Sequence, residues 1–502
     1  MSADASSSGR GPRIALLPLD ERPVNVRLPA DVAAIAGASL ALPPREMLPD
    51  LRKAGRADEL GAWLEAASDA ADALVVSTDM LCYGGLIAAR TSADPLATAL
   101  GRLEALRAIS ERHPALPVAA VTLVMRASDS YNPQEEPDYW ATHGRELHRL
   151  GAVHHRAFAG QTGADLAALE AGIPRDIRLD FERRRLRNHQ INLHALSLAA
   201  DGAIDPLLIT ADDTAEFAAG TMEQLWLTQW SRILPIPGQV LMYPGADEVG
   251  AVLVARQLAL ILDGTARFRV ECADPAGLER IPNFENGPLR VAIDRQVRAA
   301  GAELVDDAGA MALLVHAPDS RRRDLCGHIP QFDGDDRNDA ARTAELALRL
   351  LEGGRDVALA DLRYSNGGDP LLIDALRERG ILTRLAAYGG WNTAGNALGS
   401  VVAAAAATQV ARGAGTYDAA AARRLLLHRL IEDWGYQAVA RRTYDAGLRN
   451  FDAQGEAAAA RDVARELNAL LAEIAPGTTI DSVSFPWHRS FELDVTLTGA
   501  TA

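Results

Sequence analysis

Short apolar runs alternate with longer segments of helical periodicity over most of the chain. In the first half, apolar runs of strand length lie at 14–19, 39–42, 73–76, 118–124, 207–210 and 240–243. Strands that alternate with helices along a sequence pair side by side in a parallel sheet. The chain is therefore expected to be an α/β protein with an N-terminal parallel α/β domain over 13–265. The pattern leaves open whether this domain is TIM-barrel-like or an open sheet.

The alternation continues after residue 265 with a different spacing. Candidate strands at 268–270, 313–316, 357–360 and 382–386 predict a second α/β domain, flavodoxin-like or Rossmann-like, over 266–395. From 396 to 502 the chain is rich in Ala, Leu and Arg, which predicts a helical C-terminal region. A short strand at 491–497 is expected to close this region.

Composition limits the partners and the compartment. The 502 residues carry a formal net charge of −16 at pH 7. Neither nucleic acid nor a membrane is expected as a partner, because no basic face and no long apolar span stands out. Three scattered cysteines predict a reducing, cytoplasmic setting. Residues 1–12 lack the apolar core of a signal peptide and predict a disordered leader. The oligomeric state, including a homo-oligomer, stays open.

Polar residues follow almost every predicted strand at the point where the strand ends. In parallel α/β folds these ends meet at one edge, and ligands bind there. After the run at 240–243 come two adjacent carboxylates, Asp247 and Glu248, in YPGADEVG. Their repulsion raises at least one pKa, and a carboxyl that stays protonated can protonate a leaving group. The alternative role for this pair is capping of the following helix.

A second adjacent pair, Asp212 and Asp213, follows the run at 207–210 in ITADDT. This pair is the other candidate for catalysis, and its alternative roles are helix capping and the binding of a sugar hydroxyl. The sequence does not choose between the two pairs, and both can line one pocket.

Other polar and aromatic residues in these turns are candidates for binding a sugar. A Trp ring can stack on a pyranose, while amides, carboxylates and guanidinium groups bind hydroxyls. The alternatives are an internal ion pair for Arg22 and packing at a domain interface for Trp391. The predicted substrate-binding residues are Asp20, Arg22, Asp79, Tyr83, Arg126, Asn366, Trp391, Asn392 and Asn396.

No metal site and no cofactor are predicted. Six histidines lie in the helical stretch 138–198, but no H-E-x-x-H motif is present. The segment PWHRSFE, 486–492, can return to the pocket or simply cap the fold, and the structural role is favoured.

The segment GADEV is similar to the GDEV segment of the retaining β-N-acetylhexosaminidases. That resemblance implies that Asp247 orients the acetamido group of the substrate, which is the internal nucleophile, and that Glu248 is the general acid. Adjacent Asp pairs such as Asp212 and Asp213 serve hexosaminidases that act on O-linked N-acetylglucosamine.

Four motifs in order, LPLDERP, STDMLCYGGL, PGADEVG and YGGWNTAGNALG, resemble a bacterial family known as domain of unknown function 4127. The resemblance covers effectively the full length of the chain. It implies an association with carbohydrate use and a link to β-N-acetylgalactosaminidase-type glycosidases.

The leading hypothesis is an exo-acting glycoside hydrolase for β-linked N-acetylhexosamine, either N-acetylgalactosamine or N-acetylglucosamine. It would retain configuration through substrate assistance on a small-molecule or oligosaccharide substrate. One alternative is a metal-dependent sugar isomerase or hydrolase. The other is a non-catalytic, two-lobed sugar-binding protein.

Overall fold

The first half of the chain forms an open six-stranded parallel sheet. The computed structural model describes residues 11–161, 166–236, 238–326, 330–444 and 450–499, so most of the predicted leader lies outside the described residues. The strand order is β2-β1-β3-β4-β5-β6 and all pairs are parallel. Because β2 and β6 are edges, the sheet is open and not a barrel. Its strands are β1 (Arg13–Leu17), β2 (Ser39–Ala41), β3 (Ala73–Ser77), β4 (Val118–Val124), β5 (Leu207–Ala211) and β6 (Val240–Pro244).

A second parallel sheet has the order β11-β10-β9-β7-β8, which is a flavodoxin-like arrangement. The strand predicted at 382–386 is wrong: Leu382–Arg384 form a 3-10 turn, and β11 begins only at Ala387, where the chain pairs with β10. Buried Leu382 and Leu385 explain the apolar signal, because both pack in the core beside this sheet. The strands are β7 (Arg267–Cys272), β8 (Glu303–Leu304), β9 (Met311–His316), β10 (Val357–Asp361) and β11 (Ala387–Gly389).

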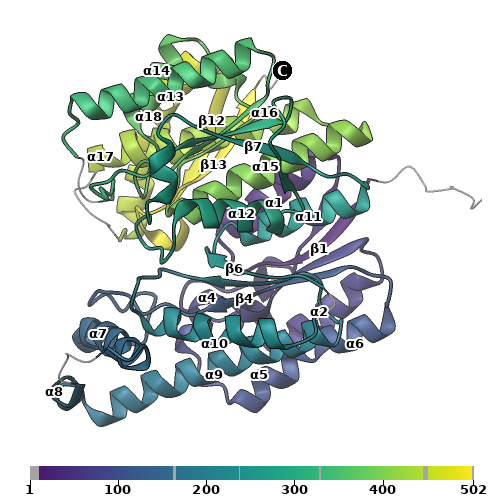
Figure 1. Cartoon of the computed structure of the whole chain (residues 1–502), viewed down its shortest axis with the longest axis vertical. Helices are drawn as coiled ribbons and strands as arrows, with labels where there is room; N and C mark the ends of the chain where they lie inside the picture. The colour runs from purple at the N-terminus through teal and green to yellow at the C-terminus, as the bar shows by residue number, and fades with distance from the viewer. Residues whose placement is uncertain (1–10, 162–165, 237, 327–329, 445–449, 500–502) are drawn as a thin grey trace, which may run out of the picture.

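The helices form layers on and between the two sheets (Figure 1). One group covers the outer face of the first sheet: α2 (Ala57–Ser68), α5 (Leu96–Leu103), α6 (Ala105–Arg112), α9 (Arg175–Ala200) and α10 (Ala219–Ile233). Between the sheets lie α1 (Pro23–Ile35), α11 (Val249–Ile261), α12 (Leu289–Ala299) and α15 (Ala394–Ala414). The outer face of the second sheet carries α13 (Gly334–Glu352) and α14 (Pro370–Glu378).

Side-chain alternation explains why the strands read as continuous apolar runs. In β1, Ile14 and Leu16 face the core shared by the two halves, whereas Ala15 and Leu17 face the outer helices. Both faces of a parallel sheet are covered, so both sets must be apolar. The Ala-rich α15 is buried along most of its length, and its small side chains let α11 pack closely against it.

The C-terminal region is mostly helical and ends in a two-stranded antiparallel hairpin, β12 (Thr478–Ser484) with β13 (Asp494–Gly499). Between these strands the chain passes through η5 (Pro486–His488) and returns to the carboxyl ends of the strands of the first sheet, where Trp487 donates to Glu21. Within the described residues, no helix is long and apolar enough to cross a membrane. The helices of this region are α16 (Ala419–Arg429), the π-helix η4 (Leu430–Ala440), α17 (Arg441–Tyr444) and α18 (Ala453–Ile474).

The remaining elements are short or belong to the region between β4 and β5. They are η1 (Arg45–Met47), α3 (Thr78–Tyr83), α4 (Leu86–Thr91), α7 (Trp140–Phe158), α8 (Leu166–Ala171), η2 (Pro275–Glu279) and η3 (Leu382–Arg384).

Candidate functional site

The loop after β1 builds one half of a buried charge cluster at the carboxyl edge of the first sheet. The Arg22 guanidinium donates to the carboxylates of Asp20, at 2.7 Å, and Asp247, at 2.5 Å. Asn25 donates to the other oxygen of Asp20 at 2.8 Å. Burial by itself would lower the pKa of Arg22, but the carboxylates of Asp20, Asp247 and Glu492 outweigh it and raise the pKa. Arg22 is therefore a fixed cation that joins the ends of β1 and β6.

The other half of the cluster surrounds the Asp212–Asp213 pair after β5. Arg90 of α4 is ion-paired with Asp212. Arg126, after β4, donates to Asp213 at 2.8 Å and to Glu136 at 2.9 Å. One Asp of the pair is thus held by a buried arginine, and its neighbour is held by a second arginine.

The two aspartates differ in what surrounds them. Asp213 keeps 31% of its side-chain surface exposed, although the protein encloses the rest. Burial, with a further contribution from the charge of Asp212, raises the pKa of Asp213 to about 6. Its backbone φ of 37° lies in the left-handed region, which a β-carbon makes unfavourable. The tight loop after β5 therefore carries a carboxyl that is partly open to solvent and able to hold a proton near neutral pH.

The C-terminal segment after β12 closes the cluster. Arg489 is ion-paired with Glu135 and lies 3.4 Å from Glu492. The Trp487 ring contacts two guanidinium groups, with Arg22 and Arg489 each 4.4 Å from the ring centroid. Cation–π contacts of this kind are stronger where water is excluded. The segment 486–492 thus contributes charged side chains to the site, which agrees with the pocket alternative and not with the favoured structural role.

Two carboxyls in this cluster have strongly raised pKa values. Burial raises the pKa of Asp79, after β3, to about 7, even though Oδ2 accepts a hydrogen bond of 3.1 Å from the Leu123 amide. Burial also raises the pKa of Glu492 to about 7, against the lowering effect of Arg22 and Arg489. Carboxyl groups that change charge near neutral pH gather at functional sites more often than elsewhere.

The side chains of the other predicted pair, Asp247 and Glu248, point in different directions. Asp247 faces the cluster, where it also accepts a hydrogen bond of 3.2 Å from the Asn392 side chain. Glu248 is fully buried, and its side chain lies against Gly399 of α15, in the helical layer between the sheets. Burial raises the pKa of Glu248 to about 8. Its Oε2 accepts a hydrogen bond of 3.0 Å from the Ala246 amide, and Oε1 has no hydrogen-bond partner among the described residues.

The loop after β11 brings the second half of the chain to this site. Asn392 adopts a left-handed backbone conformation with φ 61°, and its carbonyl accepts a hydrogen bond of 2.8 Å from the Asn366 amide. The Asn396 side chain accepts hydrogen bonds from the Ala246 and Asp247 amides at 3.4 and 3.2 Å. Asn392 therefore contacts the site directly, whereas Asn396 holds the loop that carries Asp247.

Three predicted sugar-binding side chains lie in packing positions. Trp391 is buried and its ring packs against Phe491, so the structure supports the domain-interface alternative for it. Tyr83 is buried beneath the Arg187 guanidinium. The Asn366 side chain donates to Asp324 at 2.9 Å and not to the cluster.

Sequence reasoning missed Arg90, Glu135 and Glu136, and it left Arg489 and Glu492 out of the predicted site residues. Arg90 lies inside a helix, where nothing in the sequence distinguishes it from a surface residue. The acidic pair in NPQEEP, 132–137, follows β4 and was a usable signal. Among the described residues, no group of three His, Cys, Asp or Glu side chains is arranged to hold a metal ion.

The comparison with known protein families shows which family this chain belongs to. The family described as "Protein of unknown function (DUF4127)" matches residues 14–496. The chain belongs to this family. The match extends from β1 to β13, so both sheets and the C-terminal segment lie within the matched residues. The search of curated proteins gave no match.

Proposed function

We propose that this DUF4127 protein is an exo-acting glycoside hydrolase for β-linked N-acetylhexosamine, with the Asp212–Asp213 pair at its catalytic centre. The observation that carries the proposal is the unequal environment of two adjacent carboxyls. Both are ion-paired, Asp212 with the buried Arg90 and Asp213 with Arg126, but the Asp213 side chain is the more exposed and its pKa is raised to about 6. Substrate-assisted cleavage needs this division between an ionised carboxylate and a carboxyl that can donate a proton.

Each aspartate then has a distinct role. Ionised Asp212 accepts a hydrogen bond from the N–H of the substrate's acetamido group, so that the acetamido oxygen is directed at the anomeric carbon. Protonated Asp213 gives its proton to the glycosidic oxygen as the bond to the leaving group breaks. The same carboxylate then takes a proton from the water that opens the cyclic intermediate. Neighbouring residues with these roles do not require two carboxyls on opposite sides of the sugar, as an ordinary retaining mechanism does.

Asp247 is placed to bind the sugar, whereas Glu248 is not placed to protonate the glycosidic oxygen. Asp247 lies in the cluster, where it accepts hydrogen bonds from Arg22 and Asn392 and interacts electrostatically with Asp212. Glu248 is enclosed by helices, and a general acid must come within hydrogen-bond reach of the leaving oxygen. The proposal therefore transfers the acid role suggested by GADEV to Asp213. The free state of all three cysteines supports a reducing, cytoplasmic setting as part of this proposal.

The test is hydrolysis of a panel of nitrophenyl glycosides, including both N-acetylhexosaminides, with and without chelator. We expect chelator-insensitive release from an N-acetylhexosaminide, and a loss of about 10²- to 10⁴-fold in Asp213→Asn, the usual contribution of a general acid. The matched control is Asp129→Asn in the loop after β4, where the carboxylate is largely exposed and lies 3.9 Å from Arg145.

Each other outcome contradicts the proposal in a recognisable way. Activity that disappears with chelator would favour the metal-dependent alternative. Sugar binding without turnover would favour the two-lobed binding protein. Activity lost in Glu248→Gln but kept in Asp213→Asn would return the acid role to Glu248.

A further inference from the structure

The catalytic roles assigned above leave the flat face of the sugar ring without a partner. A pyranose presents C–H groups on that face, and an aromatic side chain can stack on them. The predicted partner, Trp391, is buried against Phe491 and is not available for this role. An exposed aromatic ring beside the Asp212–Asp213 pair would supply it. Among the described residues, the exposed aromatic side chains are Tyr131, Phe158, Trp226, Trp230 and Phe284.

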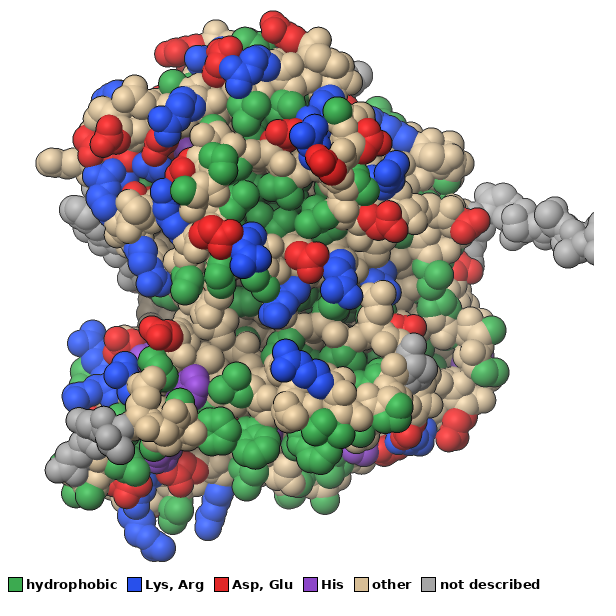
Figure 2. All heavy atoms as spheres, viewed as in Figure 1, with side chains coloured by type: hydrophobic (Ala, Val, Ile, Leu, Met, Phe, Trp, Pro, Cys, Tyr) green, Lys and Arg blue, Asp and Glu red, His purple; other side chains and the backbone are tan. Residues whose placement is uncertain are grey.

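Four of these five rings have other surroundings. Trp226 and Trp230 lie on α10 in the outer helical layer, where apolar side chains gather over α9 and α10 in the lower half of Figure 2. Phe158, at the end of α7, packs against Trp226 with ring centroids 5.6 Å apart. The ring of Tyr131 is covered by the guanidinium of Arg145, 5.1 Å from its centroid. The fifth ring is therefore the candidate.

The loop that carries Phe284 is joined to the catalytic loop. Residues 280–288 connect η2 to α12. The Phe284 carbonyl accepts hydrogen bonds from the Thr214 amide, at 2.7 Å, and from the Thr214 hydroxyl, at 3.1 Å. Thr214 directly follows the Asp212–Asp213 pair. The pair and the exposed ring thus belong to two loops that are hydrogen-bonded to each other.

The loop 280–288 also reaches the polar loop after β11. The Glu285 side chain accepts a hydrogen bond of 2.7 Å from the Gly395 amide. Gly395 lies three residues after Asn392, whose side chain donates to Asp247. The loop 280–288 is therefore held between the loop after β5 and the loop after β11, and both of these contribute side chains to the charge cluster.

The backbone brings Phe284 and Asp213 close together in an unusual conformation. Phe284 has a φ of 63° and Asp213 a φ of 37°, both in the left-handed region that is unfavourable for a residue with a β-carbon. Such residues gather at ligand-binding sites more often than elsewhere. A backbone hydrogen bond between two residues places their Cα atoms about 5.5 Å apart, and the step to a chain neighbour adds about 3.8 Å at most. The Cα atoms of Phe284 and Asp213 are thus within roughly 9 Å of each other, so one sugar unit can contact both side chains.

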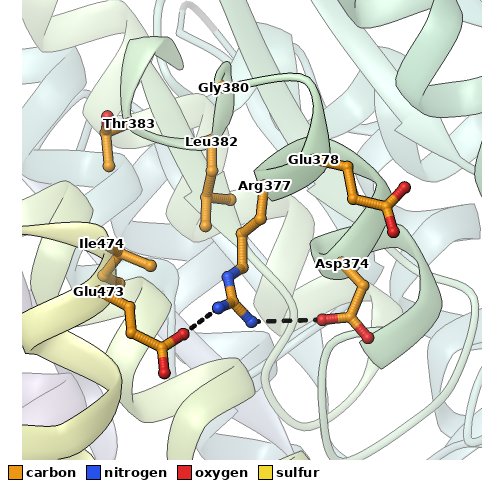
Figure 3. Close-up of a pocket in the computed structure, with 8 residues that line it drawn as sticks. All are labelled: Asp374, Arg377, Glu378, Gly380, Leu382, Thr383, Glu473 and Ile474. Atoms are coloured by element: carbon orange, nitrogen blue, oxygen red, sulfur yellow. Dashed lines mark hydrogen bonds and ion pairs between the residues drawn. The ribbon is translucent and has the colours of Figure 1, made fainter.

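A polar cavity elsewhere in the chain lacks these features. It measures about 540 Å³ and lies between the ends of α14 and α18 (Figure 3). Arg377 there extends between Asp374 and Glu473, with ion pairs to both. None of the eight residues labelled in Figure 3 is aromatic, and neither helix contributes a residue to the charge cluster described above. The size of this cavity therefore does not make it a sugar site.

We infer that Phe284 is the aromatic platform on which the terminal sugar unit stacks while Asp213 reaches its glycosidic oxygen. The inference rests on the proposed function, because it takes the substrate to be a sugar bound at the Asp212–Asp213 pair. It adds a binding residue from the second half of the chain, so the substrate site is complete only where the two halves meet.

The test compares the hydrolysis of nitrophenyl N-acetylhexosaminides by the wild type and Phe284→Asn. Asn tolerates a left-handed backbone better than most residues, so this substitution removes the ring and preserves the loop. We expect kcat/KM to fall about tenfold, mainly through a higher KM, because the ring binds the sugar and takes no part in proton transfer. Phe284→Tyr, which keeps a ring, should recover most of this loss. The matched control is Phe158→Asn, which removes an exposed ring from the end of α7 and should leave KM unchanged.

A second variant and a second measurement separate loss of the ring from loss of the fold. Phe284→Gly can adopt a φ of 63° without strain, so it should stay folded and lose the ring all the same. Calorimetric titration with N-acetylglucosamine and with N-acetylgalactosamine measures binding without turnover. We expect the sugar that the wild type binds to bind about tenfold more weakly to Phe284→Gly.

An unchanged sugar affinity in both Phe284→Asn and Phe284→Gly would overturn the inference. A loss of affinity that Phe284→Tyr shares in full would also overturn it, because the ring would then not be its cause, and so would a wild type that binds neither sugar. Failure of the proposed function looks different: the wild type would bind a sugar through Phe284 and yet hydrolyse no glycoside.

Discussion

At the scale of single residues, the chemistry of this protein depends on how each carboxyl is enclosed. Asp212 and Asp213 are adjacent, yet Arg90 pairs with the first and Arg126 with the second. Asp247 and Glu248 are also adjacent, yet one faces an ion-pair cluster and the other a helical layer. Adjacent side chains at a turn point in different directions, so two neighbours need not share one environment.

The pH dependence of hydrolysis follows from Asp213. A general acid must be protonated, and the pKa of Asp213 is raised to about 6 by burial and by Asp212. We expect kcat/KM to fall as pH rises above about 6, approaching tenfold per pH unit. The measurement is a pH profile with an N-acetylhexosaminide. A rate that stays level from pH 5 to 8 would contradict the assignment of Asp213 as acid.

The stability of the fold should depend on pH through Glu248. Burial holds the folded-state pKa at about 8, above the ordinary 4.5, so the folded protein keeps a proton that the unfolded chain releases. This contribution is fully present below pH 4.5 and is lost as pH rises toward about 8, by at most about 1.4 kcal/mol per pH unit. Denaturant unfolding should therefore show a smaller decrease in stability over this range for Glu248→Gln than for the wild type. Equal decreases in the two proteins would show that Glu248 is not the group responsible.

At the scale of elements, close packing of α15 on α11 places the loop after β11 beside the loop after β6. Gly399 makes this possible, because a β-carbon there would lie 2.2 Å from Cγ of Glu248. The π-helix η4 supports the same loop from the other side, where the Asp433 carboxylate accepts a hydrogen bond of 2.9 Å from the Gly390 amide. Asn392 thus reaches Asp247 because two helices fix the loop that carries it.

Substitution of Gly399 tests this packing. Gly399→Ala should lower the free energy of unfolding by about 1 to 3 kcal/mol, the usual cost of overpacking. The control lies in the same helix: apart from the neighbouring backbone of the helix itself, no described atom lies within 4 Å of a β-carbon added at Gly413. Gly413→Ala should raise stability by about 0.5 to 1 kcal/mol through helix propensity. Equal effects on the midpoint of denaturant unfolding would contradict the close approach at Gly399.

At the scale of the whole molecule, the two sheets share one apolar core. Residues of α1, α11, α12 and α15 pack together with strand residues of both sheets. The N-terminal half without this contact would expose the apolar faces of α1 and α11 to water.

The shared core predicts a single cooperative unfolding transition. Differential scanning calorimetry of the full chain should give one peak whose calorimetric and van't Hoff enthalpies agree. A fragment ending at residue 265 should aggregate or fail to give such a peak, because the exposed helical faces lose their partner. Two well-separated transitions in the full chain would show that the halves unfold independently.

The sequence determined the α/β class and the places where polar chemistry gathers, because strand-length apolar runs and the turn residues after them are local patterns. Asp20, Arg22, Arg126, Asp212, Asp213 and Asp247 could be found this way, and they do meet at one edge of the first sheet. The apolar residues Leu382 and Leu385 misled the same reasoning, since a buried Leu looks alike in a strand and in or beside a 3-10 turn.

Only the tertiary structure decided which carboxyl of each adjacent pair faces the cluster, because that depends on which helix packs behind the loop. It also placed Arg489 beside Glu135, which lies 354 positions earlier in the chain, and Glu492 beside Arg22, which lies 470 positions earlier. No local pattern encodes a contact across such a separation. Long-range contacts, and the burial and pKa shifts that follow from them, are properties of the folded molecule.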